Sequence, residues 1–263
     1  MRSKQKLKKI VEKIIKKETH CYFISPHLDD AALSAGGLIS YLADKVPVTI
    51  INVFTEAHEN PSTYAVKSYL KQCGYKDAKE LFRERRREDK RLFKKIGVEV
   101  INLGFTDAMW RKKDINNKII KHLSRYIPEI SHIYPTYRFH SFTGKISSED
   151  KNLEKRLKEK LLRVTNGKKC IFFCPVAIGH YADHVIVRNV TTDAFSEIIY
   201  WSDFNYSMQV SRETKFINDK KLNMGYFDKM LSSKRKLIEG YKTQRYAIFP
   251  HGKIPILPDF YYL

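Results

Sequence analysis

The alternation of short apolar runs with helical segments most strongly constrains how this chain can fold. A first apolar run spans 21–25, a helix is predicted over 31–44, and a continuous, largely β-branched run at 48–54 is typical of a strand buried on both faces. The pattern then repeats, with helices predicted at 75–96, 114–127, 148–163 and 183–195 and strands at 98–103, 131–134, 169–174 and 197–201. Strands alternating with helices form parallel βαβ units with helices on both sheet faces. We therefore expect an α/β protein with a mostly parallel sheet.

The two ends of the chain give different signals. Beyond about residue 206 we predict one helix, near 227–240, and no linker, repeat or low-complexity stretch is present, so 20–263 is expected to be a single domain. At the N-terminus, apolar residues recur at helical spacing among lysines, which predicts a basic amphipathic helix within 1–19. We expect this helix to dock on the domain. Contact with an anionic membrane surface through residues 2–17 is the alternative.

Composition narrows the class of protein. The four cysteines form no CxxC pair, and no apolar run reaches the ~18 residues that a membrane span needs. No signal peptide is evident either, so a reduced, cytoplasmic protein is predicted. The net charge of +20 would suit anionic partners, but the basic residues are dispersed and no nucleic-acid-binding motif accompanies them. We interpret the charge as a lysine-rich surface and expect no nucleic acid; a basic nucleic-acid-binding protein or nuclease is the alternative function.

The segment 25–31 (SPHLDDA) places one imidazole and two carboxylates directly after the first predicted strand. His27 and Asp30 stand three residues apart on a turn and can aim at one point, whereas the adjacent Asp29 must point elsewhere. Nitrogen and oxygen ligands with a spare carboxylate are the composition of a catalytic zinc site. We predict His27 and Asp30 as metal ligands and Asp29 as the general base that takes a proton from water.

A second cluster at 179–184 (GHYADH) follows the strand predicted at 169–174. Because ligands of such folds bind beyond the carboxyl ends of the strands, this cluster is expected to supply the third ligand of a hydrolytic site, with Asp183 orienting an imidazole. Each piece has a structural alternative. The two adjacent aspartates could cap the helix that follows, and His180 and His184 could face solvent on one side of a helix.

These segments together resemble the PIG-L/LmbE-like family of zinc-dependent de-N-acetylases. The resemblance begins at 25–37 (SPHLDDAALSAGG), close to the family's P-H-x-D-D opening, with Ala31 in place of the usual Glu, as in one branch of the family. It continues through 85–89 (RRRED), 103–108 (LGFTDA), 175–179 (PVAIG) and 183–185 (DHV), and ends at 241–244 (YKTQ). It implies a Rossmann-like three-layer sandwich. It also implies hydrolysis of an N-acetyl group with zinc, or another divalent metal, as cofactor.

The resemblance also implies roles for individual residues. By motif position His27, Asp30 and His184 are the zinc ligands and Asp29 is the general base. The expected partner is an N-acetylated amino sugar or an antibiotic or glycoconjugate intermediate that carries one. Because these four residues are all present, a non-catalytic relative is the weaker alternative.

Two further residues, Arg85 and Asp107, fall in segments that contact substrate in relatives. A charged helix face for Arg85 and a turn cap for Asp107 are their structural alternatives.

The second motif departs from the family's usual H-x-D-H. Tyr181 occupies the position two residues before Asp183, where the family has a histidine that polarises the carbonyl or protonates the leaving amine; here the histidine lies one residue earlier, at His180. Either Tyr181 or, through a shifted loop, His180 is expected to donate a hydrogen bond to the oxyanion. A site in which His180 and His184 both bind zinc would lack the glutamate of the zincin motif.

Overall fold

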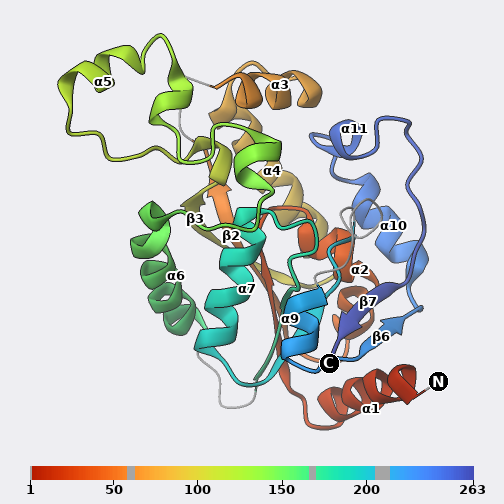
Figure 1. Cartoon of the computed structure of the whole chain (residues 1–263). Helices are drawn as coiled ribbons and strands as arrows, with labels where there is room; N and C mark the ends of the chain where they lie inside the picture. Colours follow the sequence, from red (N-terminus) through yellow and green to blue (C-terminus); the bar gives the residue numbers. More distant parts are fainter. Residues whose placement is uncertain (1, 58–62, 166–169, 205–213) are drawn as a thin grey trace.

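The computed structural model describes residues 2–57, 63–165, 170–204 and 214–263, and in these ranges seven strands form one sheet (Figure 1). The strands are β1 (His20–Ser25), β2 (Val48–Glu56), β3 (Glu99–Thr106), β4 (Cys170–Pro175), β5 (Ile198–Trp201), β6 (Met224–Phe227) and β7 (Asp259–Tyr262). Their order is β3-β2-β1-β4-β5-β7-β6, in which the first five run parallel and β7 pairs antiparallel with both β5 and β6. The predicted α/β fold with a mostly parallel sheet is confirmed.

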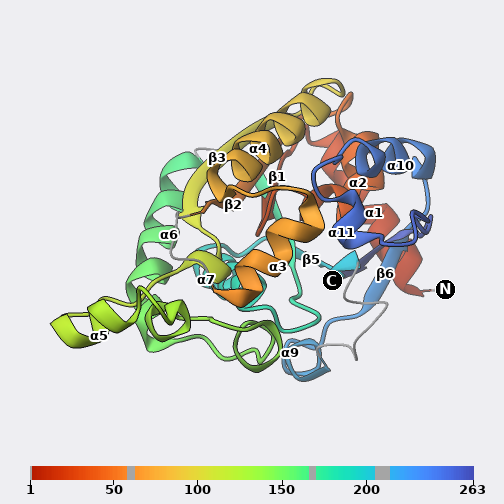
Figure 2. The same cartoon turned by 90° about the horizontal axis from the view of Figure 1, so that it is seen from above.

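Helices cover both faces of the sheet, which gives the expected three layers (Figures 1 and 2). One face carries α1 (Arg2–Lys16), α2 (Asp30–Leu42), α4 (Ala78–Lys94) and α10 (Leu231–Glu239), and the other carries α6 (Lys151–Val164), α7 (Ala182–Ala194) and α9 (Thr214–Asp219). The remaining helices are α3 (Tyr64–Cys73), α5 (Lys118–Leu123) and α11 (Arg245–Ile248), with short turns at η1 (Ala108–Trp110), η2 (Pro128–Ser131), η3 (Tyr137–Ser141) and η4 (Ser148–Asp150). The described residues form a single domain.

The central strands are buried on both sides, as their apolar runs predict. In β1, Phe23 packs into one core layer and Ile24 into the other; in β4, Phe173 and Phe172 divide in the same way. Successive side chains of a strand point to opposite faces, so a strand covered on both faces needs apolar residues at every position.

The N-terminal helix α1 docks on the domain, as expected. Its Leu7, Val11 and Ile14 are buried and belong to the core layer that also contains α2 and α4. The lysines of α1 from Lys6 onward are exposed to solvent. No helix in the described ranges is long and apolar enough to span a bilayer.

Two predictions between β3 and α6 are wrong. The strand predicted at 131–134 is instead the end of η2 followed by a single β-bridge between Lys112 and His132, outside the sheet. The helix predicted over 114–127 is reduced to α5, in which no residue is buried. Without an apolar face packed on the domain, a helix this short gains little tertiary stabilisation.

The C-terminal part differs from its prediction as well. Residues 224–227 form β6, and the helix predicted near 227–240 begins only at Leu231. The helix α3 and the strands β6 and β7 have no counterpart in the sequence-based prediction. The two strands are only four residues long, and their pairing joins segments more than 30 residues apart, so no local pattern announces them.

The Gly36–Gly37 pair lets the C-terminal elements approach α2 closely. A Cβ on Gly37 would lie 2.9 Å from both a carboxylate oxygen of Asp259 and the backbone oxygen of Lys229. Through this contact Asp259 accepts a hydrogen bond from the backbone N–H of Leu38 (2.8 Å), and it forms an ion pair with the buried Lys234 (2.7 Å). One buried pair thus joins α2, α10 and β7.

Replacing Lys234 by methionine should lower the free energy of unfolding by about 3–5 kcal/mol, because the carboxylate of Asp259 is left buried without its cation. Urea denaturation measures the loss. Lys236→Met, on the exposed side of the same helix, is the matched control and should change stability by less than about 0.5 kcal/mol. Equal effects of the two substitutions would contradict this assignment.

Candidate active site

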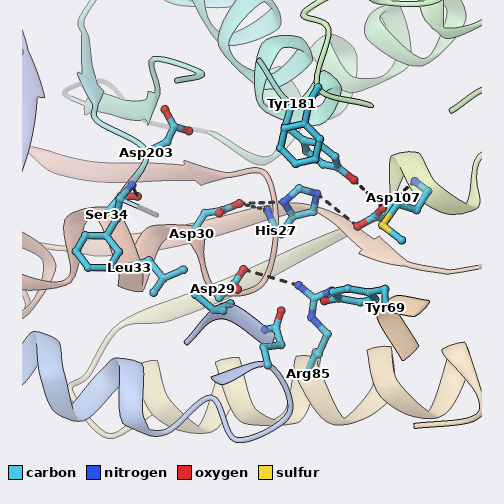
Figure 3. A pocket seen from close by; sticks show the side chains of 15 residues that line it. His27, Asp29, Asp30, Leu33, Ser34, Tyr69, Arg85, Asp107, Tyr181 and Asp203 are labelled. Atoms are coloured by element: carbon cyan, nitrogen blue, oxygen red, sulfur yellow. Dashed lines mark hydrogen bonds and ion pairs between the residues drawn. The ribbon is translucent and has the colours of Figure 1, made fainter. Parts of the chain in front are cut away.

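One pocket at the carboxyl ends of the parallel strands (Figure 3) is lined by six of the predicted site residues, namely His27, Asp29, Asp30, Arg85, Asp107 and Tyr181. The order β3-β2-β1-β4-β5 changes direction between β1 and β4, and such a switch point opens a crevice for ligands. His27 and Asp29 lie between β1 and α2, Asp30 is the first residue of α2, and Asp107 follows β3. Asp203, which also lines the pocket, follows β5.

Asp30 lies between two imidazoles. Its Oδ2 is 3.0 Å from Nδ1 of His27 and 3.3 Å from Nε2 of His184, which projects from the first turn of α7. The same oxygen accepts a hydrogen bond from the backbone N–H of His27 (2.9 Å). The sequence-predicted ligand set of His27, Asp30 and His184 is therefore brought together, although His184 lies more than 150 residues from Asp30.

The outer nitrogen of each imidazole meets a second buried carboxylate. Nε2 of His27 lies 3.1 Å from Oδ2 of Asp183, as the predicted orienting role requires, and Nδ1 of His184 lies 2.6 Å from Oδ1 of Asp203. Carboxylates in this position fix the tautomer and the ring orientation of metal-binding histidines. The inner nitrogens, Nδ1 of His27 and Nε2 of His184, consequently both face Asp30.

This donor set fits a divalent metal ion. The ligand atoms of His27, Asp30 and His184 all lie within 4.8 Å of one another, and two nitrogens with one oxygen are a donor set that zinc accepts. A second group, His27 with Asp107 and Asp183, is equally compact. In that group Asp183 is already ion-paired with Arg111 (2.5 Å), and the adjacent guanidinium disfavours a further cation.

Asp29 occupies the N-cap position of α2, but its side chain makes no capping hydrogen bond. The carboxylate lines the pocket instead, with Oδ1 3.7 Å from Nη2 of Arg85 (Figure 3). Burial and the neighbouring Asp30 raise the pKa of Asp29 to about 6, against the opposing effect of Arg85. The Asp29 side chain therefore does not cap the helix, and its role as general base stays a prediction.

The other groups have pKa shifts typical of strongly interacting buried charges. Burial alone would lower the pKa of both histidines, but the carboxylates around them outweigh it: the pKa of His184 is raised to about 9, and that of His27 well above its usual value. Burial would raise the pKa of Asp30, yet the two imidazoles hold it well below its usual range. Asp30 is therefore an ionised carboxylate, as metal binding requires, and each of the two imidazoles would give up a proton on binding a metal.

The structure separates the two candidates for the oxyanion donor. Tyr181 lines the pocket, its ring centroid 5.5 Å from that of His27 and its hydroxyl 3.4 Å from Oδ1 of Asp107. His180 is not among the residues that line this pocket. Its backbone has a left-handed conformation (φ 57°), and its ring packs against Gly144. The structure thus places the Tyr181 side chain in the pocket wall, whereas the His180 ring lies against Gly144.

Helix α4 links the pocket to the C-terminal segment. Glu88 and Asp89 follow Arg85 by about one helical turn. The carboxylate of Glu88 accepts hydrogen bonds from the backbone N–H and hydroxyl of Thr243, and Asp89 accepts one from the hydroxyl of Tyr241 (2.6 Å). These contacts hold the next residue, Gln244, in the pocket wall, where its amide nitrogen has no hydrogen-bond acceptor among the described residues. An uncompensated buried donor is costly and is available to a ligand.

Sequence reasoning missed two buried partners, Asp203 and Arg111. Asp203 follows the short strand β5, and its position after a strand end was a usable signal. Arg111 follows η1 and contacts Asp183 and, at 3.2 Å, Asp150; nothing local in the sequence distinguishes it from the surrounding lysines.

Comparison with known proteins identifies the family of this chain. Residues 22–195, more than half of the chain, match the PIG-L family, described as GlcNAc-PI de-N-acetylase. No curated protein sequence matches significantly. Among solved structures, a deacetylase in the biosynthesis pathway of teicoplanin superposes with a TM-score of 0.70 at 21% identity, covering 93% of this chain and 97% of the other.

Two more structures share the fold. A zinc-inhibited form of teicoplanin deacetylase has a TM-score of 0.70 at 20% identity, again with 93% and 97% coverage. The A40926 pseudoaglycone deacetylase has a TM-score of 0.63 at 19% identity, with 93% and 96% coverage. At such identities the likeness shows the fold, and the family match shows the kind of enzyme. The chain belongs to the PIG-L family and is a hydrolytic de-N-acetylase.

Proposed function

We propose that the enzyme removes the acetyl group from an N-acetylated amino sugar, or from a conjugate that carries one, with zinc as its metal. One observation carries the proposal: the inner nitrogens of His27 and His184 converge on the carboxylate of Asp30, while buried carboxylates hold their outer nitrogens. Three protein ligands with a base beside them are the arrangement of a hydrolytic zinc site. When bound, the ion would lower the pKa of water to roughly 7 and polarise the acetyl carbonyl.

Asp29 is the residue proposed to accept and return the proton of the attacking water. Asp29 lies beside the ligands without a capping role, and its pKa of about 6 suits a base that works near neutral pH. It removes a proton from the attacking water as the oxygen adds to the acetyl carbon. The same proton is available for the sugar nitrogen when the carbon–nitrogen bond breaks, which gives acetate and a free amine.

Tyr181 is the proposed donor to the oxyanion. Its hydroxyl lies on the Asp107 side of the pocket, next to the ring of His27. A phenol at the family's histidine position can donate one hydrogen bond to the developing negative charge. This hydrogen bond is strongest where water is excluded. His180 takes no part in this proposal.

The remaining pocket residues suit a small, hydroxyl-bearing substrate. Arg85, Asp107 and the unpaired amide nitrogen of Gln244 offer hydrogen bonds, and Phe204 adds an apolar wall. The pocket volume is about 120 Å³, below the ~300–1,000 Å³ typical of pockets that enclose drug-sized ligands. The size suits one acetylated sugar residue whose remainder extends out of the pocket.

Replacing Asp29 by asparagine should reduce acetate release from N-acetylated amino sugars by about 100- to 10,000-fold, because the general base is lost. Elemental analysis should find the metal content unchanged. Asp44→Asn, at an exposed position, is the matched control and should retain activity. Loss of metal in the Asp29 variant would instead make Asp29 a ligand.

Replacing Asp203 by asparagine should weaken metal binding by about 10- to 100-fold, because the imidazole of His184 loses the carboxylate that orients it. Competition with a chelator measures the affinity without reference to turnover. Asp193→Asn, on the exposed side of α7, should leave the affinity unchanged. An Asp203 variant with wild-type metal affinity would refute the orienting role.

Replacing Tyr181 by phenylalanine should lower kcat about 100-fold while metal content stays constant, because one oxyanion donor is lost. His180→Ala is the companion variant and should keep most of the activity. The reverse ranking would show that the loop rearranges during turnover and that His180 is the donor.

A further inference from the structure

Residues 114–130, here called the arm, leave the domain and return to it at one place. Their base is closed by a hydrogen bond from the N–H of Lys113 to the oxygen of Ser131 (2.8 Å) and by another from Ile133 to Arg111 (3.0 Å). Between these points the chain projects from the body of the protein and carries α5 at its tip (Figures 1 and 2). The arm is thus a long loop that is closed at its base by hydrogen bonds and lies outside the sheet.

The arm exposes an unusual amount of apolar surface. Ile119 is 71% exposed and Tyr126 75%, and four more large apolar side chains are exposed in the same stretch. These are Ile120, Leu123, Ile127 and Ile130. Single exposed apolar residues are normal on protein surfaces, but a cluster within twelve residues indicates a surface that meets another apolar phase.

Basic side chains surround these apolar residues. Lys113, Lys118, Lys121 and Arg125 are exposed, and none of them makes an ion pair with another described residue. The segment has only two acidic residues, Asp114 and Glu129. An apolar protein partner would bury these cations at a cost, whereas a membrane interface accepts apolar side chains below the headgroups and cations among anionic ones. The combination selects an anionic lipid surface as the partner.

The arm begins next to the active site. Asp107, in the pocket, is followed by η1 and then by Arg111 at the base of the arm, and Arg111 is ion-paired with Asp183. The arm also reaches α3, where the backbone N–H of Tyr64 donates a hydrogen bond to Glu129 (2.8 Å). In Figure 1 both α5 and α3 lie at the end of the molecule toward which β2 points, which is the end that holds the pocket.

The N-terminal helix does not offer a comparable surface. The apolar stripe of α1 is committed to the core through Leu7, Val11 and Ile14, so only its basic side is available. We propose that the arm, rather than α1, docks the protein on an anionic lipid bilayer, with Ile119, Leu123 and Ile127 entering the interface. Docking through the arm brings the end of the molecule that holds the pocket toward the membrane surface.

Vesicle co-sedimentation tests the apolar part of this proposal and does not depend on the reaction catalysed. The full-length protein should pellet with vesicles of phosphatidylcholine and phosphatidylglycerol, and far less with phosphatidylcholine alone. The triple variant Ile119→Ser, Leu123→Ser, Ile127→Ser should bind the anionic vesicles at least about 10-fold more weakly, because three apolar side chains no longer enter the interface. The matched control replaces Leu162, Tyr226 and Ile256, which are exposed elsewhere, by serine and should bind like the wild type.

Two charge-reversal variants distinguish the effect of the basic residues of the arm from that of the overall +20 charge. Lys118→Glu with Lys121→Glu should weaken binding to the anionic vesicles about 10-fold or more, whereas Lys90→Glu with Lys94→Glu, exposed on α4, should weaken it much less. Equal losses in both pairs, or wild-type binding by the triple serine variant, would overturn the proposal. The proposal would also be overturned if the wild-type protein did not bind vesicles but formed a dimer, and the triple serine variant were monomeric. The arm would then be a contact between copies of the protein. Because every substituted side chain is exposed, circular dichroism should show an unchanged fold in all variants.

Discussion

The site depends on one chain of alternating buried charges. One guanidinium and two imidazoles alternate with three carboxylates in the order Arg111, Asp183, His27, Asp30, His184 and Asp203. Removing such charges from water is expensive, and only close pairing and hydrogen bonding compensate for it. This series of buried charges therefore forms only if several strand ends keep fixed positions relative to one another. The two core layers, with apolar residues on both faces of β1 and β4, supply that rigidity.

The same arrangement divides labour among neighbouring residues. Asp29 and Asp30 are adjacent in sequence, yet Asp30 sits between two imidazoles whereas Asp29 faces Arg85. Their pKa values move in opposite directions for this reason: the imidazoles lower that of Asp30, and burial beside another carboxylate raises that of Asp29. Two carboxylates of the same type can thus serve as a ligand and as a base.

The C-terminal segment completes the pocket from outside the parallel sheet. Glu88 and Asp89 on α4 hold Thr243 and Tyr241, which places Gln244 in the wall. Residues 241–244 stand out in the sequence only through their resemblance to a family motif, because the segment has no periodicity that reveals a role. In the fold its contribution is physical: buried carboxylates accept its hydrogen bonds and position one amide.

The sequence by itself determined the parallel core and the position of the first group of candidate site residues at a strand end, because both depend on local patterns. Strands buried on both faces must be apolar at every position, and His27, Asp29 and Asp30 lie directly after such a strand. Tertiary structure decided what depends on contacts between distant segments. It pairs β6 with β7, brings Asp203 to His184, selects Tyr181 rather than His180 for the pocket, and leaves residues 131–134 outside the sheet. In each case the energy comes from a partner far away in the chain, which no local pattern encodes.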